Sequence, residues 1–481
     1  MKRRELLAGF AALPALSLAP AAAFAAERFD VIVIGAGIAG LAAAVAAREA
    51  GAPKVAVLEK GPMIGGHAAY ADGSLCAVYP PLQRPAGIID SPEKMASQLW
   101  EWGEKRGDMK LIRTLAENSG AAVDWLKDMG VRFMDRVYVS YPGNFPRAIT
   151  SHPDRGGFEY IWALNRRARL LGVRVFLNSK AISLMMDRGR VSGVEALETS
   201  GAIQGYRASS VVIATGGFSA NREMMKKYAV IPDSVRGTSA NPGGRHFDGA
   251  DGDGLAMAAD AGAALVDMTN VEVIPRKGGR LLDYVGGDIF VNSRGKRFVN
   301  ENASHGEQAE AVMRQPDQIM WVITDSQSIK GPMLQHKLLI GEVQKANTIE
   351  EMAKKMNVSA KNLKDTIERY NRFVDARDDE DFGKDIFTQK ISRPPFFFGR
   401  DYLEPHYTVG GIRISEKAEV LRGDGSAIPG LWAAGETTGG LHGSNRQGGV
   451  AFTECLVFGR IAGTEAAKHA KGAPGGKPSK R

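Results

Sequence analysis

Short apolar runs rich in β-branched residues recur along the chain, and a glycine or an acidic residue closely follows each of them. The first run covers residues 28–34, and a helical pattern at 41–49 and a second run at 54–58 come after it. Runs that are apolar on both faces are typical of strands buried in a parallel sheet. A later run at 208–213 should return to the same sheet, and another lies at 430–434. This alternation predicts an α/β fold with a parallel sheet.

Helical periodicity is also clear at 450–467, after the last of these runs, and at 349–376. The second stretch lies in a region of different texture, which also contains a Pro-Pro-Phe-Phe-Phe segment at 394–398. We therefore expect an α+β substrate-capping domain inserted into a Rossmann-like domain. The predicted division is a Rossmann-like domain in two parts, 26–270 and 406–467, and a capping domain at 271–405.

The first 25 residues are typical of an export signal. They have a basic start, an apolar stretch and a final Ala23-Phe24-Ala25, which is a small-x-small cleavage signal. The Arg3-Arg4 pair resembles a twin-arginine signal, while an ordinary secretory signal and an uncleaved anchor are the alternatives. No later segment approaches the ~20 apolar residues of a membrane helix. We therefore expect a periplasmic protein that is not inserted in the membrane after cleavage.

The net charge of +8 sits mostly at the two ends of the chain. Residues 1–25 carry a net +2 and residues 467–481 a net +5, so residues 26–466 carry only +1. A nearly neutral body without a basic stripe interleaved with aromatic residues argues against binding to nucleic acid. The Lys-rich end, 468–481, is expected to be a flexible tail exposed to solvent.

Two cysteines, Cys76 and Cys455, are too few for a disulfide framework, a cysteine zinc site or an iron–sulfur cluster. A single disulfide between Cys76 and Cys455 is an alternative that an oxidising compartment would allow. The sequence has no Cys-x-x-Cys-His for covalent haem. No metal site is predicted, and any redox chemistry needs an organic cofactor.

A glycine-rich turn follows the first apolar run directly, as Gly35-Ala36-Gly37-Ile38-Ala39-Gly40, and Glu59 ends the second run. Strand, glycines, helix, strand and acid in this order are typical of a dinucleotide site. The glycines let the backbone approach a pyrophosphate at the N-terminus of the helix, and the carboxylate of Glu59 can accept both ribose hydroxyls.

Seven segments carry a resemblance that extends over the chain: VIVIGAGIAGLAAA, LEKGPMIGGHAAYADG, VVIATGGFSAN, DGADGDGLAMAADAGAAL, GKRFVNE, HYTVGGIRI and IPGLWAAGETTGGLHGSNRQGGVAF. In this order they resemble the flavoprotein family of succinate dehydrogenase and fumarate reductase. The resemblance is strongest to the soluble flavocytochrome c fumarate reductases and their urocanate and methacrylate reductase relatives. It implies FAD as the cofactor. The residues predicted to bind FAD are Gly35, Gly37, Ala39, Gly40, Glu59, Lys60, Gly66, His67, Ala68, Gly73, Ala181, Ala214, Thr215, Gly216, Gly217, Asp253, Gly435, Glu436, Arg446 and Gly449.

Two of these residues have a more specific prediction. If the helix that begins near Gly449 points its N-terminus at the flavin pyrimidine, its dipole would stabilise the negative charge of the reduced ring. His67 matches by spacing the histidine that succinate dehydrogenases attach covalently to FAD. A non-covalent histidine near the flavin is the favoured interpretation, and covalent attachment is the alternative.

By the same resemblance the substrate is a dicarboxylate or an unsaturated acid, to which flavin N5 transfers a hydride. Arg446 matches the arginine that holds the substrate carboxylate, a task for which the fork of a guanidinium is suited. His406 and Tyr407 lie in the family's substrate-facing segment, where Tyr407 replaces a histidine. His305 stands where the family has its proton-donating arginine, so His305 or Tyr407 is the expected proton donor.

The sequence thus predicts a periplasmic FAD enzyme that reduces the C=C bond of an α,β-unsaturated carboxylate. The family's H-P-T and T-E-x-x-R-G segments, which supply a second substrate histidine and a proton relay, are missing from this sequence. Without this second anchor the resemblance suggests a monocarboxylate with a less polar body. Because the chain has no haem motif, a separate c-type cytochrome is expected to supply the electrons. One alternative is a dehydrogenase that introduces a C=C bond, as succinate or ketosteroid dehydrogenases do. The other is a flavin electron carrier without substrate turnover.

Overall fold

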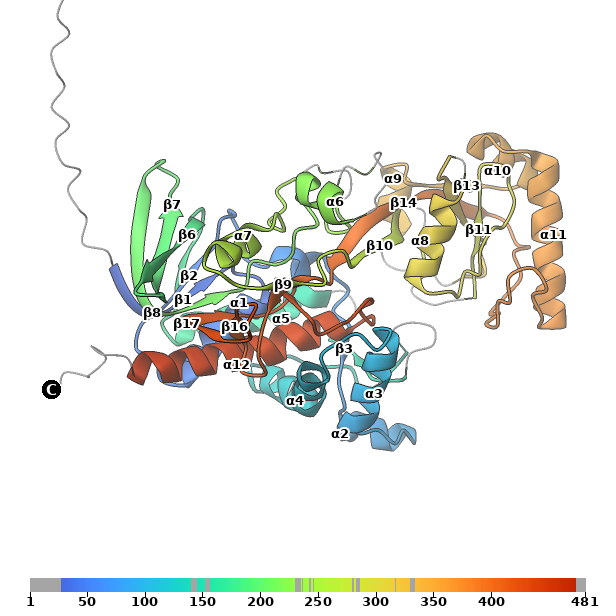
Figure 1. Ribbon diagram of the computed structural model, residues 1–481. Helices are drawn as coiled ribbons and strands as arrows, with labels where there is room; N and C mark the ends of the chain where they lie inside the picture. Colours follow the sequence, from blue (N-terminus) through green and yellow to red (C-terminus); the bar gives the residue numbers. More distant parts are fainter. Residues whose placement is uncertain are drawn as a thin grey trace, which may run out of the picture.

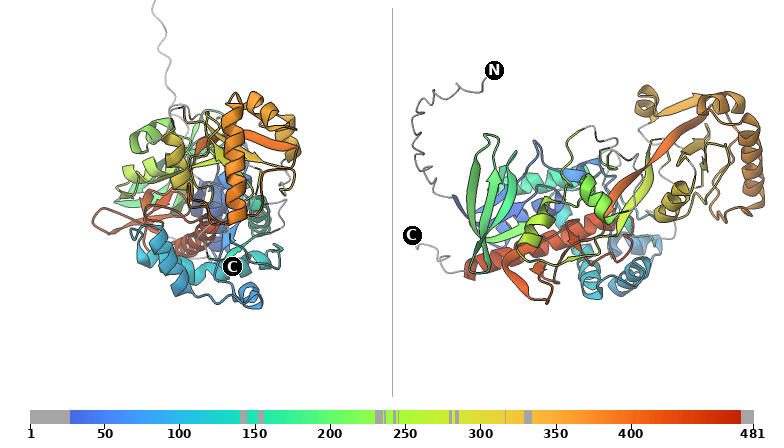
Figure 2. Two further views of the ribbon diagram at one scale, coloured as in Figure 1. Left: turned by 90° about the vertical axis from the view of Figure 1, so that its right-hand side faces the viewer. Right: turned by 45° about the horizontal axis from the view of Figure 1, so that its top comes forward.

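The computed structural model shows an elongated molecule with two lobes (Figures 1 and 2). The residues that it describes are 27–139, 145–151, 156–229, 235, 237–241, 244, 246–278, 281–282, 286–315, 317–328 and 334–472. The predicted export signal at 1–25 lies outside this part of the chain.

The first lobe is built on an eight-stranded sheet. Its main path runs β16-β17-β8-β1-β2-β5, and β7 and β6 extend it from β8. The strands are β1 (Glu27–Ile34), β2 (Val55–Leu58), β5 (Arg174–Phe176), β6 (Lys180–Asp187), β7 (Arg190–Leu197), β8 (Ile203–Ile213), β16 (Glu419–Leu421) and β17 (Ala427–Ala433). β1 pairs in parallel with β2 and with β8, which confirms that the run at 208–213 returns to the first sheet. The predicted α/β fold is confirmed.

Helices cover one face of this sheet as a layer. The long helix α12 (Val450–Gly472) runs beside α1 (Ile38–Glu49), and α5 (Gly156–Leu170) packs on the other side of α1. Below α12 in Figure 1 lie α2 (Pro80–Gln83), α3 (Pro92–Trp102) and α4 (Met109–Asp128). The remaining elements of this lobe are η1 (Gly66–Tyr70), β3 (Leu75–Cys76), η2 (Arg84–Ala86), β4 (Ala148–Ile149), α6 (Arg222–Tyr228), α7 (Asp253–Asp260), β9 (Leu265–Val266), β15 (Gly411–Arg413) and β18 (Thr438–Gly439).

Glycines on α12 bring it close to α1. A Cβ atom added at Gly459 would lie 2.7 Å from the carbonyl oxygen of Ala39, and one added at Gly463 would lie 2.0 Å from that of Ala43. Both contacts are with backbone, which cannot turn aside as a side chain can. The two helices can therefore keep their separation only if these positions lack a Cβ.

Gly463→Ala is expected to lower the free energy of unfolding by about 1–3 kcal/mol, the usual cost of overpacking a core. Gly472→Ala is the matched control, because an added Cβ there meets nothing within 4 Å and the helix is the same. Urea unfolding followed by circular dichroism measures both variants. Equal midpoints for the two variants would contradict this account of the helix pair.

The second lobe holds the region that the sequence predicts as a cap. Two long strands, β10 (Val271–Gly278) and β14 (Phe396–Thr408), pair antiparallel and connect it with the first lobe (Figure 1). Their sheet also contains β11 (Ile289–Val291), β12 (Met320–Thr324) and β13 (Val343–Ala346). The helices of this lobe are α8 (His305–Met313), α9 (Leu334–Leu339), α10 (Ile349–Met356) and α11 (Ala360–Ala376). The predicted helical stretch at 349–376 is two helices, because Asn357 adopts a left-handed conformation and Ser359 caps α11.

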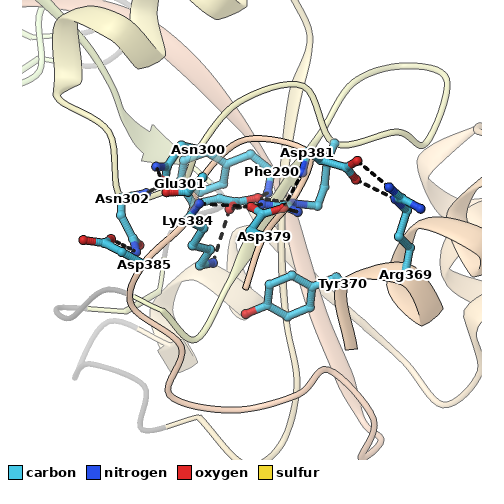
Figure 3. A network of polar contacts seen from close by, with 12 residues as sticks. Phe290, Asn300, Glu301, Asn302, Arg369, Tyr370, Asp379, Asp381, Lys384 and Asp385 are labelled. Atoms are coloured by element: carbon cyan, nitrogen blue, oxygen red, sulfur yellow. Dashed lines mark hydrogen bonds and ion pairs between the residues drawn. The ribbon is translucent and has the colours of Figure 1, made fainter. Parts of the chain in front are cut away.

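A buried network of ion pairs holds this lobe together (Figure 3). Arg297 donates to Glu301 and to Asp379, each at 2.8 Å, and the Nζ of Lys384 lies 3.2 Å from Glu301. All four side chains are at most 4% exposed. Two cations thus face two carboxylates away from water. Arg297 and Glu301 belong to the GKRFVNE motif, so this part of the motif stabilises the fold.

The far end of the chain differs from its prediction. Helix α12 runs on to Gly472, so Lys468 and Lys471 lie on a helix that continues past the predicted end at Ala467. Residues 473–481 of the predicted tail lie outside the described part. Among the described residues, no helix is long and apolar enough to span a membrane. Cys76 and Cys455 form no disulfide with each other.

Candidate active site

A large cavity opens at the carboxyl ends of the central strands. Ile34 at the end of β1, Leu58 at the end of β2 and Ala214 just after β8 line its wall. In open parallel sheets this edge is where ligands bind. Glu272 and Ser304 from the second lobe line the same cavity, so both lobes contribute to it.

The glycine turn after β1 fits a pyrophosphate. Gly35 has a φ of +102°, and a Cβ there would lie 2.3 Å from the carbonyl oxygen of Ala214. Gly37, Gly216 and Gly66 face open space: a Cβ at the first two would meet nothing within 4 Å, and one at Gly66 only the Cα of Gly37, at 3.7 Å. Gly37 begins α1 without a side-chain cap, so the first amides of this helix face the cavity free for an anion.

Glu59 is held in place for a ribose. Its Oε2 accepts a hydrogen bond from the backbone N–H of Ala36 at 2.8 Å, and its Oε1 accepts one from that of Gly61 at 2.7 Å. Each carboxylate oxygen has two lone pairs, so each keeps one for a hydroxyl group. This geometry fits the adenosine ribose of FAD.

Most predicted cofactor residues line the cavity. They are Gly35, Gly37, Ala39, Glu59, Lys60, Gly66, His67, Ala68, Gly73, Ala181, Ala214, Thr215, Gly216, Asp253, Glu436, Arg446 and Gly449. Three predicted glycines are not among the lining residues, and they are required instead because a side chain at these positions would collide with neighbouring atoms. A Cβ at Gly40 would lie 1.9 Å from the oxygen of Gly35, one at Gly217 would lie 1.9 Å from Oγ1 of Thr408, and one at Gly435 would lie 2.8 Å from Cβ of Ala39.

His67 forms a half-buried ion pair with Asp248. Its Nε2 lies 2.6 Å from the Oδ1 of Asp248, whose Oδ2 accepts from the hydroxyl of Thr238 at 2.7 Å. Burial alone would lower the pKa of His67, but the hydrogen bond and charge of Asp248 raise it. Burial would raise the pKa of Asp248, and His67 and Thr238 together lower it to about 2. Both shifts favour a protonated His67 beside an ionised Asp248 at the cavity wall.

The start of α12 also lies at the cavity. Gly448, Gly449 and Ala451 line it, so the N-terminus of this 23-residue helix faces the cavity. Its partial positive charge favours an anion there. The role of this helix beside the flavin pyrimidine stays a prediction.

Arg446 lies buried at the wall of the cavity. Its Nη2 donates to the Oε2 of Glu272 at 2.7 Å, and its Nη1 donates to the carbonyl of Gln447 at 3.1 Å. The two side chains are 5% and 8% exposed. The Nε of Arg446 is buried and has no hydrogen-bond partner among the residues that the structure describes. The guanidinium lies over the ring of Tyr407, 4.7 Å from its centre.

Tyr407 turns its hydroxyl toward a second buried group. The hydroxyl donates to the Oε2 of Glu454 at 2.5 Å, and the Nε2 of His442 lies 3.0 Å from the same oxygen. Burial and the charge of Glu454 raise the pKa of Tyr407 well above its ordinary value. Burial alone would raise the pKa of Glu454, but His442, Tyr407 and Thr438 lower it. Since the phenol proton is committed to Glu454, the geometry does not favour Tyr407 as the proton donor.

The structure describes the side chain of one predicted histidine, His406, but only the backbone of the other, His305. His406 lines the cavity, and its Nδ1 lies 2.6 Å from the hydroxyl of Ser239. His305 is the first residue of α8, directly after Ser304, which caps this helix and lines the cavity. The side chain of His305 lies outside the described part of the structure.

Several site residues were not predicted from the sequence. Glu272, Asp248 and Glu454 each pair with a predicted or neighbouring site residue, yet none lies in a motif position that marks a catalytic role. Two signals were present in the sequence: Asp248 opens the segment DGADGDGLAMAADAGAAL, and Glu272 lies between apolar neighbours in Val-Glu-Val, where an acid is expected to be buried and paired. No cluster of three His, Cys, Asp or Glu that could hold a metal occurs among the described residues.

Comparisons with known proteins agree with this site. Residues 30–451 match the model of a family described as FAD binding domain. The fumarate reductase (cytochrome) of Shewanella frigidimarina is 34% identical over 459 residues, which cover 92% of this chain and 78% of that protein. Urocanate reductase of Eggerthella lenta is 33% identical over 461 residues, covering 91% of this chain and 74% of that protein. The structure of the open conformation of a flavocytochrome c3 fumarate reductase gives a TM-score of 0.78 at 33% identity, covering 92% of this chain and 79% of that one.

The fold and the cavity define an FAD-dependent oxidoreductase. The chain belongs to the FAD binding domain family, among the flavoproteins of the fumarate and urocanate reductases that reduce C=C bonds. The predicted family and cofactor are confirmed.

Proposed function

We propose that this protein reduces the C=C bond of an α,β-unsaturated carboxylic acid, or of a carbonyl derivative of one. The observation that carries the proposal is Arg446, buried at the cavity wall with an unpartnered Nε. A guanidinium N–H that donates to the substrate carbonyl withdraws electron density from the conjugated double bond. FAD would supply the two-electron chemistry, a hydride from flavin N5 to one carbon of that bond.

The second lobe caps the substrate in this proposal. Glu272 on β10 and Ser304 before α8 both line the cavity, which supports a capping domain at 271–405 inserted between two parts of the FAD-binding domain. Closure of such a domain over the cavity would exclude water from the reacting bond. The basic tail and export signal would lie outside these two domains.

We assign the proton donor to one of two histidines, His305 or His406. An imidazole titrates near neutral pH and suits general acid catalysis. His406 lines the cavity beside Ser239, and His305 follows the cavity residue Ser304. Tyr407 would instead position Arg446, because its ring lies under the guanidinium.

The proton donor can be found with three variants. His305→Gln or His406→Gln is expected to slow alkene reduction by roughly a hundredfold or more, the usual contribution of a general acid. Tyr407→Phe should slow it less than about tenfold, because its proton is held by Glu454 and is not offered to the substrate. The rate is read from re-oxidation of the reduced flavin in a stopped-flow spectrometer. If only Tyr407→Phe slowed re-oxidation of the flavin, this assignment would be overturned.

We also propose that FAD is bound without a covalent bond. The Nε2 of His67 is engaged by Asp248, and the raised pKa disfavours the neutral, nucleophilic imidazole, so His67 is poorly placed to bond the flavin. Acid precipitation of the holoenzyme should leave all of the flavin in the supernatant. Flavin that stays with the pellet, and is lost from it in His67→Ala, would establish covalent attachment instead.

Electrons are proposed to come from a separate c-type cytochrome in the periplasm, after export by the twin-arginine route. The similarity to a fumarate reductase (cytochrome) supports this. Reduced cytochrome c from the periplasm of the source cell should reduce the flavin. Substitution of Arg3 and Arg4 by lysine should retain the protein in the cytoplasm.

An anaerobic panel tests the proposed function. The holoenzyme is reduced with a viologen donor, and re-oxidation of the flavin is recorded after unsaturated acids, their esters and their amides are added. Rapid re-oxidation by one class supports the proposal. If none re-oxidises the flavin while a saturated compound reduces the oxidised enzyme, the protein is a dehydrogenase. If neither reaction occurs, the electron-carrier alternative holds.

A further inference from the structure

Glu272 fixes Arg446 from the opposite strand. Glu272 on β10 is the register partner of Tyr407 on β14, and the register shifts between Glu272 and Val273. Directly opposed residues of an antiparallel pair point to the same face, so Glu272 and Tyr407 share the face that lines the cavity. Arg446 lies over the Tyr407 ring and donates to Glu272. The three residues form one packed unit.

The ion pair between Arg446 and Glu272 changes the charge that the cavity offers to a substrate. A lone buried guanidinium would attract a carboxylate, but here one carboxylate already lies 2.7 Å away. Arg446 and Lys60 are the arginine and lysine of the described cavity lining, and Lys60 pairs with Asp251 and Asp253. His67 is likewise paired with Asp248. The described lining therefore holds no arginine or lysine whose charge is uncompensated.

One donor of Arg446 nevertheless lacks a partner among the described residues. Its Nε is buried in a side chain that lines the cavity, and an unsatisfied buried N–H is costly. A carbonyl oxygen would satisfy it without adding a charge. A second carboxylate would satisfy it too, but would lie beside Glu272, and like charges at close range repel strongly inside a protein.

We propose that Glu272 sets the substrate class: the site takes a C=C bond activated by an uncharged carbonyl group, such as an ester, amide or ketone, in preference to a dicarboxylate. This inference rests on the proposed function for the reaction itself, but the charge preference concerns binding and can be measured without turnover. Arg446 keeps its role as the group that polarises the carbonyl.

Binding to the oxidised holoenzyme tests the charge preference. Succinate, monomethyl succinate and dimethyl succinate share one carbon skeleton and carry charges of about −2, −1 and 0 at neutral pH. Their dissociation constants are read from perturbation of the flavin absorbance. Dimethyl succinate should bind at least about tenfold more tightly than succinate, given the repulsion of a second carboxylate near Glu272. Succinate binding as tightly as its dimethyl ester, or no binding of the ester, would overturn the proposal.

Three variants distinguish the effect of the Glu272 charge on binding from the general effects of a substitution. Glu272→Gln keeps an acceptor for Arg446 but removes the charge, so it should tighten succinate binding by about tenfold or more and remove the ester preference. Glu272→Asp keeps the charge and should keep the preference, which provides a second test if Glu272→Gln folds poorly. Glu101→Gln removes an exposed carboxylate beside the cavity residue Trp102 and should change neither. If Glu272→Gln bound succinate and its two methyl esters in the same order of affinity as the wild type, the inference would be contradicted.

The reaction is tested separately with fumarate, monomethyl fumarate and dimethyl fumarate. The reduced wild-type flavin should be re-oxidised fastest by the dimethyl ester. If the succinate series binds in the expected order but no fumarate compound re-oxidises the flavin, the proposed reduction fails while the charge preference stands. If fumarate itself is the fastest oxidant, the charge preference fails while the proposed reduction stands.

Discussion

Replacing Arg446 by methionine is expected to slow re-oxidation of the reduced flavin by an activated alkene by roughly a thousandfold, as loss of a buried donor to a developing oxyanion does. The physical reason is that Arg446 lines the cavity, where Glu272 holds its Nη2 and its buried Nε lacks a partner among the described residues. Stopped-flow re-oxidation with the best substrate of the wild-type protein measures the effect. A variant that re-oxidises within tenfold of the wild type would exclude Arg446 from the reaction.

The same substitution should also destabilise the protein, and this effect can be separated. Arg446→Met removes the ion-pair partner of Glu272, which is 8% exposed, and breaking a buried ion pair costs about 3–5 kcal/mol. In the double variant Arg446→Met/Glu272→Gln the buried charge of Glu272 is gone too, so most of the melting temperature should return. The activity should not return, because the donor to the substrate is still missing. Recovery of both would show that Arg446 acts only through folding.

Arg297→Met is expected to destabilise the protein strongly. It removes the cation that Glu301 and Asp379 share and leaves Lys384 beside Glu301, at a cost of about 3–5 kcal/mol. Hydrogen exchange of peptides from α11 and thermal unfolding measure the effect. Arg369→Met is the matched control: its pair with Asp381 lies beside the network in Figure 3, but both side chains are exposed, so little change is expected.

The pH dependence of this network has a definite sign. Burial would raise the pKa of Glu301 and Asp379, but Arg297 and Lys384 lower that of Glu301, and Arg297 lowers that of Asp379. Groups whose pKa is lowered on folding stabilise the protein above their unfolded values, 4.5 for Glu and 3.8 for Asp. Their contribution is therefore complete at neutral pH and is lost as the pH falls below about 4. A wild-type stability that rises between pH 5 and pH 3 would contradict this assignment.

Local patterns predicted the parts of the fold that are continuous in sequence. The buried strand at 28–34, the glycine turn after it and the acid at Glu59 lie within one short stretch, and the structure places all three at one edge of the sheet. The helix after Gly449 was predicted from its apolar periodicity and begins at the cavity. In such segments the backbone conformation is dictated by neighbours a few residues away.

The pairings that decide charge in the site could not be predicted in the same way. Arg446 and Glu272 are 174 positions apart, and His67 and Asp248 are 181 apart. Their contact depends on the register of β10 with β14 and on how the loops fold over the cavity, which no local pattern contains. For the same reason Tyr407 suggested a proton donor in the sequence, while the structure ties its hydroxyl to Glu454.

The most direct test of this account is a single turnover with a defined amount of flavin. Holoenzyme carrying one FAD per chain is reduced anaerobically, freed of excess reductant and mixed with the alkene that re-oxidises it fastest. The account predicts one molecule of saturated product per flavin in the wild type by mass spectrometry, and none on the same timescale in Arg446→Met. Re-oxidation without saturated product, or a full yield from Arg446→Met, would contradict it.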